Sequence, residues 1–106
     1  MWKIVTHDHF MNQNLIFPAA QPSVACIVKN AEKYPSVKKI TVFGSSVTSA
    51  FSPVSDIDIL AEQDDGIRYP LAKGCMRGVD YWRKDDCDES LLAEVSKNGI
   101  VVFQRD

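Results

Sequence analysis

Two short segments of this chain carry side chains that could handle phosphates and a metal ion. The first is "VFGSS", in which Gly44 follows an apolar run and would let the backbone approach a ligand without a Cβ in the way. The free N–H groups of a following helical turn, with the hydroxyls of Ser45 and Ser46, could hold a triphosphate. An ordinary turn between a strand and a helix uses the same residues, so this segment alone does not decide between the two.

The second segment is "SDIDILAE", residues 55–62, in which acidic and apolar residues alternate. The two-residue period of a strand places Asp56 and Asp58 on one face and Ile57 and Ile59 on the other. Two neighbouring carboxylates suit Mg²⁺, which takes carboxylate ligands together with substrate phosphates and water. The alternative is the solvent-facing side of an amphipathic strand. However, adjacent carboxylates repel each other, and Ser or Thr would have served that purpose as well.

A third acidic residue, Asp80, interrupts the apolar and aromatic run "VDYW", where Asp is disfavoured. It could be a charge that protects an edge strand from aggregation. If its strand lies beside that of Asp56 and Asp58, three carboxylates would face the phosphate-binding turn. Such a cluster can hold two metal ions about 3.5–4 Å apart.

The elements that must position these residues follow from hydrophobic periodicity and from Gly and Pro breakers. We expect helices over residues 23–33 (with Ser23 as N-cap), 45–51 and 88–99, and strands over 37–44, 55–62, 75–82 and 100–103. Residues 1–21 are an N-terminal arm of uncertain structure, in which "WKIV" could be a short strand and whose apolar residues could dock onto the core or a partner. The order predicts an α/β (α+β) fold, a small mixed β-sheet flanked by helices.

Composition limits the remaining possibilities. The 106 residues correspond to one domain, spanning 1–106. Scattered basic residues and a net charge of −2 argue against binding to extended nucleic acid. No apolar run approaches the roughly 18 residues that a membrane span requires, and the N-terminus lacks the apolar core of a signal peptide. We therefore expect a cytoplasmic protein with no membrane contact.

The chain contains Cys26, Cys75 and Cys87, an odd number without CxxC spacing. Zinc sites need closely spaced ligands, which this pattern does not offer. We expect all three to be free thiols.

Taken as a set, these motifs resemble the DNA polymerase β-like nucleotidyltransferase superfamily, and more closely its minimal members. The segment "VFGSSVTSAFSPVSDIDILAE" is similar to the core motif of that family. "VDYW" stands where the family has its third carboxylate strand, and "LLAEVSKNGIVVF" resembles its closing helix and strand. The resemblance covers roughly residues 22–104.

The resemblance implies transfer of a nucleoside monophosphate, with AMP from ATP as the expected case, onto an acceptor hydroxyl. Gly44 and Ser45, with Ser46, would bind the β- and γ-phosphates. Asp56 and Asp58 would bind two Mg²⁺ ions. Asp80 would bind one of them and help to deprotonate the acceptor.

Small members of the family are typically encoded beside a HEPN-domain protein, with which they can act as antitoxin and toxin. The resemblance therefore implies that the acceptor hydroxyl belongs to such a partner protein. Two alternatives stay open. One is a non-catalytic antitoxin that neutralises its partner by occlusion, and the other is a subunit of a small-molecule nucleotidyltransferase.

One departure from the family favours the occlusion alternative. Many relatives carry an Arg shortly after the Gly-Ser pair, whereas here the next cation is Arg68. Arg68, Lys73 or Arg77 could supply the missing charge from a loop, or could simply be solvated loop charges.

Overall fold

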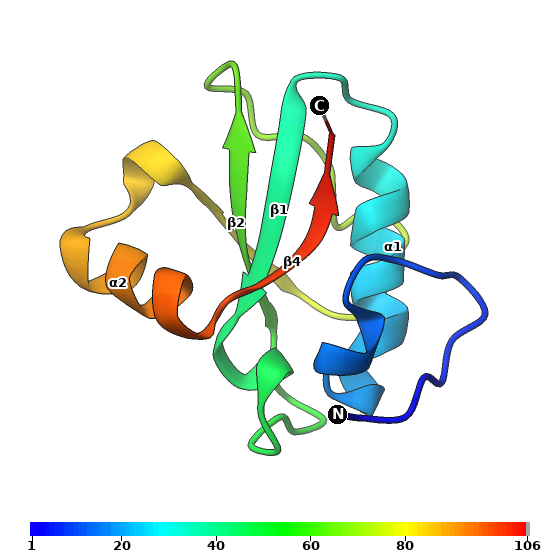
Figure 1. Ribbon diagram of the computed structural model, residues 1–106. Coiled ribbons are helices and arrows are strands. Elements are labelled where there is room, and N and C mark those ends of the chain that lie inside the picture. Colours follow the sequence, from blue (N-terminus) through cyan, green and yellow to red (C-terminus); the bar gives the residue numbers. More distant parts are fainter. Residues whose placement is uncertain (106) are drawn as a thin grey trace.

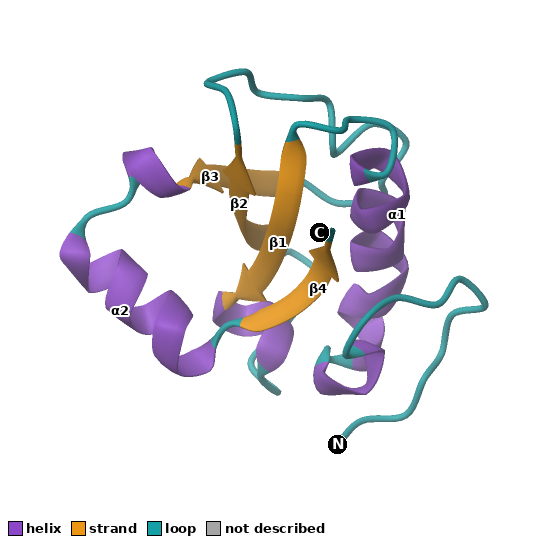
Figure 2. Cartoon of the chain, turned by 45° about the horizontal axis from the view of Figure 1, so that its top comes forward, coloured by secondary structure: helices purple, strands orange, loops and turns teal. Residues whose placement is uncertain are grey.

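The computed structural model describes residues 1–105 as a four-stranded sheet with a helix on each face (Figures 1 and 2). The strands lie in the order β3-β2-β1-β4. β1 is antiparallel to both of its neighbours, and β2 and β3 are parallel. The mixed sheet flanked by helices that the sequence predicted is confirmed. The strands are β1 (Val37–Phe43), β2 (Ile57–Gln63), β3 (Val79–Arg83) and β4 (Ile100–Gln104).

The two central strands carry apolar side chains on both faces, at the places where a helix covers the sheet. Ile40 and Ile59 belong to the cluster that packs against α1 (Gln21–Ala31). Phe43 and Leu60 point the other way and pack with Val95 of α2 (Glu89–Asn98). The alternating side chains of one strand therefore hold a helix on each face.

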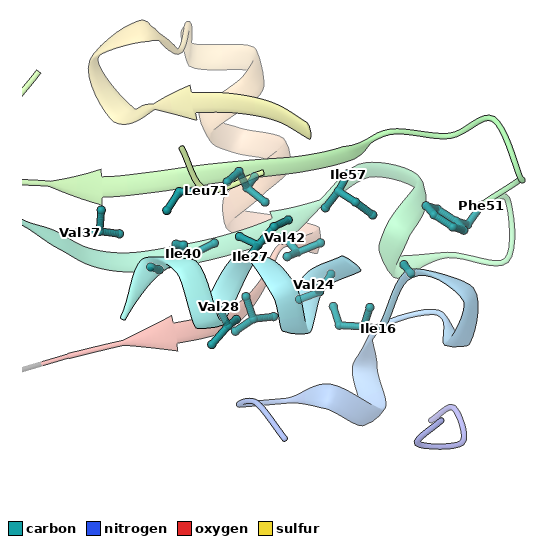
Figure 3. Close-up of a cluster of buried hydrophobic side chains, with 14 residues drawn as sticks. Ile16, Val24, Ile27, Val28, Val37, Ile40, Val42, Phe51, Ile57 and Leu71 are labelled. Atoms are coloured by element: carbon teal, nitrogen blue, oxygen red, sulfur yellow. The ribbon is translucent and has the colours of Figure 1, made fainter. Parts of the chain in front are cut away.

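Helix α1 presents a fully apolar stripe to the sheet. Val24, Ile27 and Ala31 have no exposed surface, and Figure 3 shows Ile27 beside Ile40 and Val42 of β1. Burying a Val or Ile side chain stabilises a fold by roughly 1.5–3 kcal/mol, so this stripe fixes the helix on the sheet.

The predicted start of this helix is wrong by two residues. It begins at Gln21, no side chain caps it, and Pro22 lies in its first turn. A Pro in the first turn loses no hydrogen bond, because the N–H group it lacks would have had no helical partner. Ser23 is buried inside the first turn instead of capping it.

The N-terminal arm docks onto the protein's own core and contains no strand over residues 2–5. The fully buried Gln21 accepts a hydrogen bond from the N–H of Val5 at 2.9 Å. Its amide donates to the carbonyls of Lys3 at 2.8 Å and Ile16 at 3.0 Å. Ile16 itself lies in the main core cluster. One buried amide thus attaches the arm at three points.

Other predicted boundaries also differ from the structure. Helix α1 ends at Ala31 instead of residue 33, and the bounds of α2 and β4 differ by one residue. The short helix expected over 45–51 is a 3₁₀ turn, η3 (Gly44–Val47). β2 begins at Ile57, so Asp56 precedes the strand. The third strand occupies only the end of the predicted range and extends one residue beyond it. In residues 1–105, no helix combines the length and apolar character that a membrane span requires.

The expectation of three free thiols is wrong for two of them. Cys26 of α1 and Cys75 form a disulfide, and Cys87 is free. The loop that carries Cys75 folds back onto α1, where the Asn30 amide donates to the carbonyls of Leu71 at 2.6 Å and Lys73 at 2.9 Å. This contact joins distant parts of the chain, so local cysteine spacing could not reveal it.

We expect reduction of this disulfide to lower the free energy of unfolding by about 2–4 kcal/mol. The bond joins residues 49 apart in sequence, and in the chain-entropy model a closure of that length restricts the unfolded chain strongly. Urea denaturation with and without dithiothreitol measures the change. Cys87→Ser should keep the full sensitivity to reductant and Cys26→Ser should lose it. Identical curves for all samples would contradict the pairing.

Candidate active site

Gly44 is the point where β1 ends and turns beneath the carboxylate of Asp58. Its φ of 76° lies in the left-handed region, which side chains other than glycine rarely adopt. A Cβ atom at this position would lie 2.5 Å from Oδ2 of Asp58. Only glycine therefore allows the turn and this carboxylate to lie so close together.

The register of β2 and β3 places Asp58 directly beside Asp80. Burial, followed by the hydrogen bond and the charge of Asp80, raises the pKa of Asp58 from 3.8 to about 6. The negative charges of Asp56 and Glu94 add to this rise. Asp58 is half-buried and Asp80 is exposed on the outer strand. The structure thus brings together two of the three predicted carboxylates as an interacting pair.

Asp56 lies just before β2, against the segment that leads into β3. A Cβ atom on Gly78 would lie 2.7 Å from Oδ1 of Asp56. The N–H of Ile57 donates to the carbonyl of Gly78 at 3.0 Å and joins the two segments. Asp56 is therefore at the same end of the sheet as Asp58, and close enough to raise the pKa of Asp58.

Arg77 holds the loop that precedes Asp56. Its guanidinium donates to the carbonyls of Ser52 at 3.2 Å, Pro53 at 3.0 Å and Ser55 at 3.2 Å. It also lies 4.5 Å from the ring centroid of Phe51. The sequence suggested that Arg77 either binds phosphate or is a solvated charge. In the structure it stabilises the loop over residues 52–55 instead.

Arg68, the second candidate cation, is also bound within the protein. It forms an ion pair with Asp86 at 2.7 Å and donates to the carbonyl of Tyr81. Lys73 is exposed on the loop attached to α1. None of the three candidates lines the cavity beside Gly44.

That cavity, of about 490 Å³, lies between η3 and α2. Its described lining contains one acidic side chain and no basic one, and consists of Gly44, Ser45, Val47, Thr48, Ala50, Glu94 and Asn98. Sequence reasoning missed Glu94 and Asn98. Their spacing of four residues puts both on one face of the predicted helix, which is the available signal, but nothing local shows which element that face meets.

The Ser46 hydroxyl is not presented to this cavity in the way that the sequence suggested. Ser46 has no exposed surface, and its Oγ has no hydrogen-bond partner among the described residues. The turn therefore offers Gly44 and Ser45 to a ligand and encloses Ser46.

The donor chemistry of this site fits a divalent cation. Residues 1–105 contain no three His, Cys, Asp or Glu side chains already arranged to hold a metal ion. However, carboxylate oxygens are the ligands that Mg²⁺ prefers, and the mutual repulsion that raises the pKa of Asp58 is of the kind that a bound cation relieves. Asp56, Asp58 and Asp80 are the side chains that could share such an ion.

Comparison with known proteins relates this arrangement to a family. Residues 26–97 match the family described as "Nucleotidyltransferase domain". No curated protein sequence matches the chain.

Three solved structures have a similar fold. An Asp-to-Glu double mutant of the toxin–antitoxin MntA-HpeT has a TM-score of 0.59 and 18% identity, over 78% of this chain and 71% of that one. A Tyr-to-Ala mutant of the same pair has a TM-score of 0.57 and 21% identity over the same shares. A toxin–antitoxin with AMP-PNP has a TM-score of 0.61 and 18% identity, over 91% and 76%. At these identities the likeness concerns the fold.

Proposed function

Because the chain belongs to the nucleotidyltransferase domain family, we propose that it transfers AMP from ATP to a hydroxyl of a partner protein in a Mg²⁺-dependent reaction. The acceptor oxygen bonds to the α-phosphorus, and pyrophosphate leaves. The family match confirms the enzyme class that the sequence predicted. One observation carries the finer proposal. The sheet register sets Asp58 beside Asp80, at the end of β1 where Gly44 leaves room for a carboxylate.

The proposal gives each residue a separate task. The backbone at Gly44 and the hydroxyl of Ser45 bind the phosphates, since both residues lie at the edge of the cavity and Gly44 adjoins the carboxylate of Asp58. Asp56 and Asp58 hold two Mg²⁺ ions, and Asp80 holds one of them. When bound, the ions supply positive charge that stabilises the attacking and leaving oxygens. Contact between a phosphate and the enclosed Ser46 would require the turn to open.

Asp80 is also the residue that accepts the proton of the acceptor hydroxyl. It lies on β3, an outer strand, and its side chain is exposed, so a partner protein can reach it. A general base must come within hydrogen-bond reach of the proton that it removes. Asp58, half-buried between β1 and β3, is less accessible to an acceptor.

The similar structures support this choice of partner. Two are of the toxin–antitoxin MntA-HpeT, and the third is of a toxin–antitoxin with AMP-PNP, an analogue of ATP. We therefore propose that this chain is an antitoxin, that its acceptor is a hydroxyl on a toxin of the HEPN type, and that its nucleotide is ATP.

One observation favours a second candidate function, neutralisation of the partner by occlusion alone. No Lys or Arg is among the described residues that line the cavity beside Gly44, and Glu94 adds negative charge there. A triphosphate would depend on metal ions, backbone donors and hydroxyls for its binding. In this alternative the chain covers its partner without transferring a nucleotide.

Label transfer distinguishes the two functions. The purified chain is mixed with Mg²⁺, α-labelled ATP and a lysate of its source cells. We expect one labelled protein band with wild type. Asp80→Asn should reduce the label about 10²- to 10³-fold, because it removes a charge that holds metal and accepts the proton. Asp85→Asn, a change of the same kind at an exposed site in η4 (Lys84–Asp86), is the control and should label normally.

Two outcomes would contradict the proposal. Absence of label with every nucleotide, while wild type and Asp80→Asn both retain the partner in a pull-down, would favour occlusion. Equal labelling by wild type and Asp80→Asn would remove Asp80 from the reaction.

A further inference from the structure

We infer that the cavity between η3 and α2 binds the ribose of the nucleotide, with Glu94 accepting hydrogen bonds from the ribose hydroxyls. This inference rests on the proposed function and makes its substrate more specific. The protein would select ribonucleotides over 2′-deoxyribonucleotides, and Glu94 would be the residue that distinguishes them, through its hydrogen bond to the 2′-hydroxyl.

The cavity adjoins the phosphate site directly. Gly44 and Ser45 belong to its lining, and Oδ2 of Asp58 lies against Gly44 on the carboxylate side. Val95, the residue after Glu94, packs against Phe43, the residue before Gly44, so α2 approaches this end of β1. A nucleotide whose phosphates lie at Gly44 and Ser45 therefore has this cavity within reach of its sugar. The volume of about 490 Å³ lies within the range of small-molecule sites.

Charge decides which part of the nucleotide the cavity suits. A triphosphate tail in contact with Glu94 would meet a like charge, and no basic residue belongs to the described lining. A sugar is neutral and carries hydroxyl donors. An ionised carboxylate only accepts hydrogen bonds, so Glu94 is matched to those hydroxyls and mismatched to phosphate oxygens. Glu94 also forms no ion pair with any residue between 1 and 105, which leaves its carboxylate available.

The opposite wall of the cavity is held in place by its own hydrogen bonds. Thr48 donates from its N–H to the carbonyl of Ser45 at 3.0 Å, and from its hydroxyl to the same carbonyl at 3.1 Å. The N–H of Ala50 donates to the Thr48 hydroxyl at 3.1 Å. Val47 and Ala50 supply apolar surface for the carbon face of a sugar. A wall fixed before binding loses little freedom when the ligand arrives.

Asn98 completes the lining one helical turn beyond Glu94. Its amide carries both donors and an acceptor, so it can contact a second ribose hydroxyl or the edge of the base. Both side chains project from an α-helix, which positions them more rigidly than a loop would.

The test measures binding, so it does not depend on turnover. Isothermal titration calorimetry compares ATP, 2′-deoxy-ATP and 3′-deoxy-ATP with the full chain in Mg²⁺. A lost hydrogen bond to a charged group weakens binding about 10- to 100-fold. We expect wild type to bind 2′-deoxy-ATP weaker than ATP by that factor, and 3′-deoxy-ATP shows whether the second ribose hydroxyl is also bound. Glu94→Ala should bring ATP and the analogues within about 3-fold of one another. Glu89→Gln, an exposed change in the first turn of the same helix, should keep the wild-type ratio.

Three results would overturn the inference. They are equal affinity of wild type for ATP and 2′-deoxy-ATP, an unchanged ratio of these affinities in Glu94→Ala, and no binding of ATP. Glu94→Ala that weakens ATP and the analogues equally, with a higher Mg²⁺ requirement, would mean that Glu94 serves the metal ions instead. Glu94 is exposed, so we expect the Glu94→Ala variant to remain folded, and a thermal melt verifies this.

Failure of this inference can be distinguished from failure of the proposed function. Label transfer at equal rates from ATP and 2′-deoxy-ATP would retain the transferase and reject ribose selection. Selective binding of ATP without any label transfer would retain the ribose site and reject the transferase.

Discussion

Gly44→Ala should reduce nucleotide transfer about 10²- to 10³-fold and destabilise the fold. The backbone at this position has a φ of 76°, which costs a residue with a Cβ atom about 1–2 kcal/mol. The new Cβ would lie 2.5 Å from Oδ2 of Asp58, so the carboxylate must move. A displacement of about 1 Å at a reacting centre can reduce the rate about 10²-fold. Label transfer and urea denaturation measure the two effects.

Gly74→Ala provides a matched control for this prediction. Gly74 has nearly the same conformation, with a φ of 78°, but a Cβ atom there would meet nothing within 4 Å. We expect it to lose about 1 kcal/mol of stability through backbone strain and to retain transfer. If both variants lose activity to the same extent, strain alone explains the loss, and the contact between Gly44 and Asp58 has no special role.

The sequence was sufficient for the parts of the site that lie within one element or at its end. The alternation in β2 placed Asp58 and Ile59 on opposite faces, and the apolar run before Gly44 located the end of β1 to within one residue. The pairing of Asp58 with Asp80 followed only if their strands were neighbours. That condition depends on the topology of the sheet, which a single sequence does not state.

The parts that were missed depend on contacts between distant segments. Glu94 reaches the site because α2 packs on Phe43 and Leu60, and Cys26 meets Cys75 because a loop returns to α1. Arg77 was recognisable as a loop cation. However, its donation to three carbonyls of residues 52–55 could not be read from its position. Local pattern determined the elements, and long-range packing determined which side chains share the site.

The acidic character of the site has a cost to the protein in the absence of a cation. Asp58 has an unfavourable environment when ionised, because it is half-buried and faces Asp80, Asp56 and Glu94. Residues kept at a site despite such a cost are commonly functional, since a change that relieved the repulsion would stabilise the fold. The same reasoning yields the prediction that separates catalysis from stability most clearly.

Asp58→Asn should abolish transfer while stabilising the protein above neutral pH. The pKa of Asp58 is about 6 in the folded protein, against an ordinary 3.8, so the folded state binds the proton more tightly than the unfolded chain does. The wild type therefore loses stability as pH rises from about 4 through 6. The full shift corresponds to about 3 kcal/mol, and solvent screening of this half-exposed group reduces it to about 1–2 kcal/mol.

Urea denaturation at pH 4, 6 and 8 without divalent cations tests this sign. Wild type and Asp58→Asn should be similar at pH 4, and the variant should be more stable by about 1–2 kcal/mol at pH 8. Asp85→Asn, the exposed control, should follow the wild type at every pH. Added Mg²⁺ should stabilise the wild type more than Asp58→Asn, because only the wild type offers the full set of carboxylates. Two results would contradict this prediction: Asp58→Asn less stable than wild type at pH 8, or a difference in stability between the two proteins that does not change with pH. Either would mean that Asp58 does not lie in a cluster of repelling carboxylates. The electrostatic argument for a cation at this site would then fail.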